Sequence, residues 1–101
     1  MNFLRLIFGE KVNLQEVISN GATILDVRTK GEYQSGHLKN SINIPIDNLQ
    51  QKIVKLNKNK PIITCCASGA RSASARRMLK SNGFELVYNG GSWYSLRKYT
   101  S

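Results

Sequence analysis

The sequence is poor in cysteine and histidine, and this shortage excludes two kinds of stabilised small domain. Its 101 residues include two cysteines, the neighbours Cys65 and Cys66, and one histidine, His37. A disulfide between adjacent residues closes a strained ring and cannot join distant segments, so a disulfide scaffold is excluded. These side chains also fall short of the four ligands of a structural zinc site. We therefore expect no metal and no other cofactor.

Long apolar runs are absent too. A membrane-spanning helix needs about 18 or more consecutive apolar residues, and the sequence has no such run, so no transmembrane segment is expected. The apolar stretch at residues 3–8 is interrupted by Arg5 and lacks the cleavage site of a secretory signal. We expect residues 1–10 to form a short apolar helix or extension and residues 11–101 to form one domain. Free thiols persist best in a reducing compartment, which predicts a cytoplasmic protein.

Acidic residues are scarce. Six Asp and Glu stand against 15 Lys and Arg, which gives the chain a net charge of +9. Such an excess favours anionic partners, from small oxyanions to acidic protein surfaces. Nucleic-acid binding is not expected, because no aromatic residues are interleaved with the basic ones and no known reading element is present.

Short apolar runs alternate with helix-like stretches along the chain. The pattern predicts strands at residues 23–27, 41–44, 62–65 and 84–88, helices at residues 14–19, 30–35, 48–56 and 72–82, and a last helix after Gly90-Gly91 that carries Trp93. The helix start signals are Asn13, Thr29 with Glu32 as a capping box, and Asp47. Strands separated by helices predict an α/β fold whose mostly parallel sheet is covered on both faces. Ligands bind at the carboxyl ends of such strands, which directs attention to the residues after Cys65.

The segment from Cys66 to Ser72 carries the chemical signal. Four small residues follow Cys66, namely Ala67, Ser68, Gly69 and Ala70. They let the backbone curl tightly, so that several N–H groups can point at one spot. Arg71 and the helix that starts near Ser72 add positive charge there. We expect this environment to lower the pKa of Cys66 below about 8.5 and to make it a nucleophile, with residues 67–71 holding an anion on its sulfur.

An ordered set of motifs resembles the single-domain rhodaneses, which are thiosulfate sulfurtransferase-like proteins. The motifs are Asp26-Val27-Arg28, Glu32-Tyr33, Gly36-His37-Leu38, Ser41-Ile42-Asn43-Ile44-Pro45, Cys66-x-x-Gly69-x-Arg71-Ser72 and Gly90-Gly91-Ser92-Trp93. The resemblance runs from about Val12 to Tyr99. It implies that residues 11–101 form a rhodanese-like domain of three layers, with a central sheet of about five strands and helices on both faces.

The resemblance also implies a reaction. Cys66 would take sulfane sulfur from thiosulfate or a persulfide donor, hold it as a persulfide, and pass it to a thiophilic acceptor. That acceptor would be cyanide in the test tube and a small thiol or a protein in the cell. Asp26, Arg28 and Ser72 would support the loop, with contact between Arg28 and the substrate left open. The donor would be a small anionic sulfur compound, and the protein a monomer or weak dimer.

Two alternatives remain open. Phosphatase and arsenate-reductase relatives use Cys-x5-Arg, and counting to Arg71 gives five intervening residues from Cys65 but four from Cys66. Gly69, three residues after Cys66, favours Cys66 and the shorter sulfurtransferase loop. The other alternative is a non-catalytic rhodanese-like module that binds an acidic protein partner. The presence of both Cys66 and Arg71 favours the enzyme, because a site without activity could lose either residue.

Three further residues have structural interpretations. Cys65 is expected to be a small residue that finishes the strand, and a role in resolving the Cys66 persulfide is a hypothesis to test. His37 is expected to be a hydrogen-bonded structural side chain, and Trp93 a core anchor for the last helix.

Overall fold

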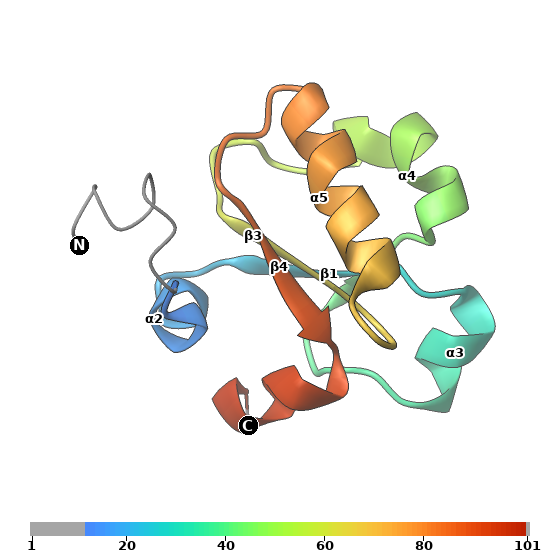
Figure 1. Cartoon of the computed structure of the whole chain (residues 1–101), viewed down its shortest axis with the longest axis vertical. Coiled ribbons are helices and arrows are strands. Elements are labelled where there is room, and N and C mark those ends of the chain that lie inside the picture. The colour runs from blue at the N-terminus through green and yellow to red at the C-terminus, as the bar shows by residue number, and fades with distance from the viewer. Residues whose placement is uncertain (1–11, 101) are drawn as a thin grey trace.

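Strands and helices alternate along residues 12–100, the part of the chain that the computed structural model describes (Figure 1). The elements are α2 (Leu14–Ser19), β1 (Thr23–Asp26), α3 (Lys30–Ser35), β2 (Ile42–Asn43), α4 (Ile46–Lys52), the 3₁₀ helix η1 (Ile53–Lys55), β3 (Ile62–Cys66), α5 (Ala70–Ser81), β4 (Val87–Ser92) and the 3₁₀ helix η2 (Tyr94–Tyr99). The extension predicted for residues 1–10 lies outside this part. No helix within it is long and apolar enough to cross a membrane.

The strands form one parallel sheet. Their order is β2-β1-β3-β4, and each neighbouring pair runs parallel. The predicted α/β fold is therefore confirmed, although residues 12–100 contain four strands where about five were expected. β3 lies between β1 and β4, and all of its residues are buried. A strand that is buried on both faces typically has a nearly continuous apolar sequence. The segment Ile62-Ile63-Thr64-Cys65 has such a sequence.

Helices cover both faces of the sheet. Alternate residues of a strand point to opposite faces, so neighbouring positions of β3 join different cores. Ile62 and Cys66 pack in the core under α4 and α5, whereas Ile63 and Cys65 pack in the core under α2 and η2. Figure 1 shows the resulting three layers, with α4 and α5 on one side of the strands and α2 and the C-terminal turn on the other.

Local start signals predicted some helix boundaries and missed others. Asn13 caps α2 through a bond from the N–H of Glu16, and Thr29 forms a reciprocal capping box with Glu32 at the start of α3, both as predicted. The prediction for Asp47 was wrong. Helix α4 starts at Ile46, so Asp47 lies in its first turn. A carboxylate there interacts favourably with the helix dipole, but Asp47 does not cap the helix. Helix α5 starts at Ala70, two residues before the predicted Ser72.

The last strand is longer than its sequence indicates. β4 continues through Gly90-Gly91, where a turn was expected, and the segment after it is a 3₁₀ helix. A Cβ at Gly90 would lie 2.7 Å from Cγ2 of Ile63, 2.9 Å from Cδ1 of Leu96 and 3.0 Å from the carbonyl oxygen of Thr64. Glycine is therefore needed here, because β4 and η2 approach β3 closely. The same approach lets the N–H of Trp93 donate to the carbonyl oxygen of Cys66 at 2.8 Å.

We predict that Gly90→Ala destabilises the fold. Overpacking of this kind lowers the free energy of unfolding by about 1–3 kcal/mol. Gly31→Ala is the matched control, because a Cβ at this exposed helical position meets nothing within 4 Å. Alanine has the higher helix propensity, so Gly31→Ala should be neutral or stabilising. Urea unfolding measures both, and equal effects of the two variants would contradict the close approach.

An ion pair joins α3 to α5. Nη1 and Nη2 of Arg71 lie 2.7 Å and 3.0 Å from the two carboxylate oxygens of Glu32. Glu32 also accepts the N–H of Thr29 in the capping box. The hydrogen bond from Arg71, followed by those from Thr29, lowers the pKa of Glu32 from its ordinary 4.5 to about 2. One carboxylate thus stabilises both the start of α3 and its contact with α5.

This pair predicts how stability depends on pH. A carboxylate with a lowered pKa in the folded state contributes stability above its unfolded pKa and loses it as pH falls through its folded pKa. We expect Glu32→Gln to lower the free energy of unfolding by about 1 kcal/mol at pH 7, because the pair is partly exposed. The difference from wild type should shrink between about pH 5 and pH 2. Glu85→Gln is the control, because Glu85 is exposed and forms no ion pair within residues 12–100. A difference in unfolding free energy between Glu32→Gln and wild type that does not change with pH would contradict the prediction.

Candidate active site

Cys66 is the last residue of β3 and lies at the start of the loop that leads into α5 (Figure 1). The residue is fully buried. Its sulfur accepts the N–H of Gly69 at 2.9 Å and that of Ser72 at 3.4 Å, and the hydroxyl oxygen of Ser72 lies 3.5 Å away. The chain thus folds back over the sulfur and directs main-chain donors at it, as the small residues of the loop predict.

Gly69 gives the loop this shape. Its φ of +109° is in the left-handed region that side chains disfavour. A Cβ there would meet only the Cα of Gly91, at an ordinary 3.5 Å, so the backbone conformation and not lack of space requires glycine. Ala67, Ser68 and Ala70 are exposed around the loop, and none of them has a side chain large enough to cover it.

The surroundings favour the thiolate form of Cys66. Burial acts to raise the pKa of the thiol, but the hydrogen bonds from Ser72, Gly69 and Ser68 act in the opposite direction and prevail. The net effect lowers the pKa of Cys66 below that of an ordinary cysteine. Backbone dipoles that stabilise a thiolate also stabilise other anions built on the same sulfur.

Cys65 lies on the opposite face of the sheet. It is fully buried against residues such as Ile24, Ile63 and Leu96. Burial, assisted by the charge of Asp26, raises the pKa of the Cys65 thiol to about 12. A disulfide between the two cysteines would require β3 to leave its extended geometry, so this arrangement disfavours a resolving role for Cys65. The loop amides surround Cys66, and the count to Arg71 from that sulfur is four residues.

Arg71, which is expected to add positive charge at Cys66, lies in the first turn of α5. Its guanidinium is paired with Glu32, which is the main cause of its raised pKa; the Cys66 thiolate is a smaller cause. Arg71 is therefore close enough to interact with the thiolate, but its charge is largely balanced by the carboxylate. The sequence placed Glu32 in the capping box and in the family motif Glu32-Tyr33, but assigned it no role at this site.

Asp26 and Arg28 form a buried ion pair at the end of β1. Nη2 of Arg28 lies 2.8 Å from a carboxylate oxygen of Asp26, and the same guanidinium donates to the carbonyl oxygens of Glu32 and Gly36. It also lies over the ring of Trp93, at 4.6 Å from the centroid. Arg28 thus joins β1, α3 and the segment after β4.

Asn43 and Asn89 are polar residues that sequence reasoning missed as site residues. Nδ2 of Asn43 donates to the carbonyl oxygens of Asp26 and Arg28 at 3.0 Å each, which fixes the chain between them. Oδ1 of Asn89 accepts the hydroxyl of Ser72 at 2.6 Å. Asn43 falls within a family motif, so that motif was an available signal. Nothing in the sequence marks Asn89, because its contact with Ser72 depends on β4 lying beside the start of α5.

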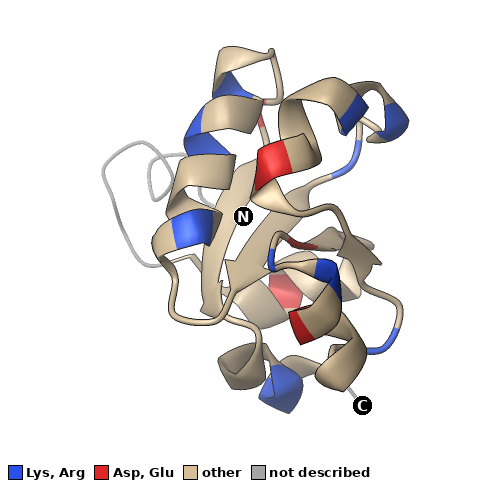
Figure 2. Cartoon of the chain, turned by 90° about the vertical axis from the view of Figure 1, so that its right-hand side faces the viewer, with Lys and Arg blue, Asp and Glu red and all other residues tan. Residues whose placement is uncertain are grey.

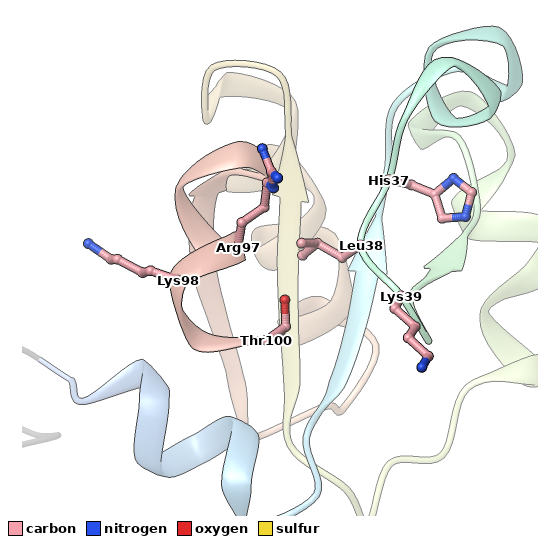
Figure 3. Close-up of a pocket in the computed structure, with 6 residues that line it drawn as sticks. All are labelled: His37, Leu38, Lys39, Arg97, Lys98 and Thr100. Atoms are coloured by element: carbon pink, nitrogen blue, oxygen red, sulfur yellow. The ribbon is translucent and has the colours of Figure 1, made fainter.

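His37 and the cavity beside it lie apart from Cys66. Nδ1 of His37 is 2.7 Å from the carbonyl oxygen of Tyr33, and the two rings are stacked, as expected of a structural histidine. A cavity of about 410 Å³ is lined by His37, Leu38, Lys39, Arg97, Lys98 and Thr100. Figure 3 shows the side chains of Lys39 and Lys98 extending to opposite sides of this cavity, so these two cations do not converge on one ligand. Within residues 12–100, no three His, Cys, Asp or Glu side chains gather as metal ligands.

Sequence comparison finds a family model and several relatives that resemble most of the chain. A family model described as a rhodanese-like domain matches residues 11–95. The "Putative sulfur carrier protein YrkF" of Bacillus subtilis is 37% identical over 82 residues, which cover 81% of this chain and 42% of that protein. The tRNA uridine(34) hydroxylase of Escherichia fergusonii is 34% identical over 74 residues, covering 67% of this chain and 21% of that protein. The chain thus spans less than half the length of either relative.

Solved structures share the fold. A rhodanese-related protein from Thermoplasma volcanium has a TM-score of 0.73 and 37% identity, with 84% of each chain covered. The human single domain sulfurtransferase TSTD1 has the same TM-score at 21% identity, with 87% of this chain and 92% of that chain covered, and shows the fold alone. Since the family model spans most of the sequence and the Thermoplasma protein is 37% identical over 84% of each chain, the chain belongs to the rhodanese-like family.

Proposed function

We propose that the chain is a sulfurtransferase that carries sulfane sulfur on Cys66. The observation that supports this best is the 2.9 Å hydrogen bond from the N–H of Gly69 to the Cys66 sulfur. Together with the other donors of the loop it favours a thiolate, which is the nucleophilic form. The relatives include a protein whose name describes a sulfur carrier.

The first half of the reaction loads the sulfur. The Cys66 thiolate attacks the outer sulfur of thiosulfate, a new S–S bond forms, and the bond between the two thiosulfate sulfurs breaks. Sulfite leaves with the electron pair of that bond, and the outer sulfur remains on Cys66 as a persulfide anion. A small-molecule or protein persulfide would donate in the same way and leave as a thiolate.

The second half unloads it. A thiophilic acceptor attacks the outer sulfur of the persulfide, and the Cys66 sulfur leaves as a thiolate, ready for another cycle. Cyanide would become thiocyanate, and a thiolate of a small molecule or protein would become a persulfide. Because the two substrates react in turn on one sulfur, the kinetics should be ping-pong.

The loop residues would hold the anion. Residues 67–71 supply backbone N–H groups around the terminal sulfur, and the dipole of α5 adds to them. Since Cys66 is fully buried, the small exposed side chains of the loop would shift to admit the donor. Arg71 would contribute to the field in its pair with Glu32 and not as a separate ligand for the substrate.

The alternatives have less support. A phosphatase-like reaction needs a wider loop for a tetrahedral dianion, whereas four residues separate Cys66 from Arg71, and Glu32 already occupies that guanidinium. A non-catalytic module for an acidic partner is favoured by the net charge of +9 alone. Figure 2 shows Lys and Arg positions spread over several helices and loops of the coloured part of the chain.

We predict that thiosulfate adds one sulfur atom to the protein at Cys66. Intact-mass spectrometry after incubation should show this gain for wild type and for Cys65→Ala, and no gain for Cys66→Ala. Cyanide should then remove the sulfur as thiocyanate. A wild-type protein that gains no sulfur from thiosulfate or from a small-molecule persulfide would falsify the proposal. A resolving role for Cys65 would show instead as a sulfur atom that wild type releases as sulfide, leaving a Cys65–Cys66 disulfide, and that Cys65→Ala retains.

A further inference from the structure

A polar chain extends from Cys66 through Ser72 to Asn89. The hydroxyl oxygen of Ser72 lies 2.6 Å from Oδ1 of Asn89, 3.0 Å from the carbonyl oxygen of Gly69 and 3.5 Å from the Cys66 sulfur. A hydroxyl group has one hydrogen to donate and two lone pairs. These three neighbours therefore compete for a single hydrogen.

The surroundings decide where that hydrogen points when Cys66 is protonated. The N–H of Gly91 donates to Oδ1 of Asn89 at 2.9 Å, which fixes the side-chain amide with its oxygen toward Ser72. The carbonyl oxygen of Gly69 already accepts the N–H of Ala73 at 3.1 Å. The short contact with Asn89 is thus the best place for the Ser72 hydrogen, and the lone pairs of Ser72 are left to accept the S–H of Cys66.

Loss of the thiol proton reverses this preference. A thiolate is an acceptor only, so Ser72 stabilises it only if its hydroxyl turns and donates to the sulfur. The turn breaks the contact with Asn89, whose oxygen keeps the N–H of Gly91. A thiolate that accepts the Ser72 hydroxyl therefore forms at the cost of the short hydrogen bond between Ser72 and Asn89.

We propose that Asn89 is a positioning residue for Cys66. Its side-chain oxygen competes with the Cys66 sulfur for the Ser72 hydrogen and so limits how readily the thiolate forms. The link to catalytic rate rests on the proposed sulfurtransferase reaction, whereas the competition itself does not. The device would keep the nucleophile partly protonated at rest, which protects an oxidisable thiol.

The charged groups around this chain belong to other contacts. They are the Asp26–Arg28 pair at the end of β1, Glu32 on α3, and Arg71 and Arg76 on α5. Tyr88 and Cys65 are the other titratable side chains nearby. Within residues 12–100, none of their side chains hydrogen-bonds to the side chain of Ser72 or Asn89. Removal of the Asn89 amide therefore leaves both ion pairs in place.

The test is the pH dependence of Cys66 alkylation by iodoacetamide in a Cys65→Ala background. The midpoint of the rate profile reports the thiolate fraction at iodoacetamide concentrations where the rate is first order in reagent, so that loop opening does not limit it. Ser72→Ala should raise the midpoint by about one pH unit, because the thiolate loses a donor. Asn89→Ala should lower it by about half a unit, which is a roughly threefold faster rate at pH values below the midpoint.

Three controls separate competition from general loosening. Asn89→Ala should have no effect once Ser72→Ala is present, because no hydroxyl remains to compete for. Asn89→Asp, a stronger and charged acceptor, should raise the midpoint, and it serves if Asn89→Ala does not fold. Ser74 lies in the same helix, and its hydroxyl oxygen accepts a hydrogen bond from Arg77. Ser74→Ala should therefore leave the midpoint unchanged.

Some outcomes would overturn the inference. An unchanged or raised midpoint for Asn89→Ala would do so, as would an equal effect of Asn89→Ala with and without the Ser72 hydroxyl. If only Asn89→Asp folds, an unchanged or lowered midpoint for it is the contrary result. Since the titration uses no sulfur donor, it can succeed even where thiosulfate loading fails, so the two failures are distinguishable.

Discussion

The hydrogen bond from the Gly69 N–H to the Cys66 sulfur is the interaction on which the other features of the site depend. It requires a left-handed glycine between a central strand and a helix start, and it requires β3 to end at the edge where parallel strands present their carboxyl ends. The same edge brings β4 beside the loop, since Gly90 allows β4 to approach β3 closely. The fold thus places backbone donors where a charged side chain would otherwise be needed.

The side-chain charges of the site mainly fix its frame. Arg28 is held by Asp26 and by carbonyl oxygens, and Arg71 is held by Glu32. These pairs fix α3 and the end of β1 against α5 and the segment after β4. Stabilisation of an anion at Cys66 is therefore left mostly to N–H groups, which remain in place at any pH at which the fold is stable. Ser72 is the adjustable donor of the set.

Local sequence signals predicted the features that depend on a few neighbouring residues. The caps at Asn13 and Thr29, the loop after Cys66 and the alternation of strands and helices are of this kind. The structure differed wherever a distant segment decided the outcome. Gly90-Gly91 has a turn signature, yet β4 pairs with β3 on both sides of it, at Asn89 and Ser92, so the two glycines form an irregularity within the strand. Likewise, the Arg71–Glu32 pair and the contact of Asn89 with Ser72 join residues 39 and 17 positions apart, which no local pattern encodes.

The central claim is that main-chain and Ser72 donors lower the pKa of the Cys66 thiol despite its burial. The most direct measurement is a titration of thiolate ultraviolet absorbance in the wild-type protein, with the same titration of Cys66→Ala subtracted. The account predicts a difference signal with a midpoint clearly below the value of about 8.5 for a free cysteine. A midpoint at or above that value would contradict it, because burial would then outweigh the hydrogen bonds to the sulfur.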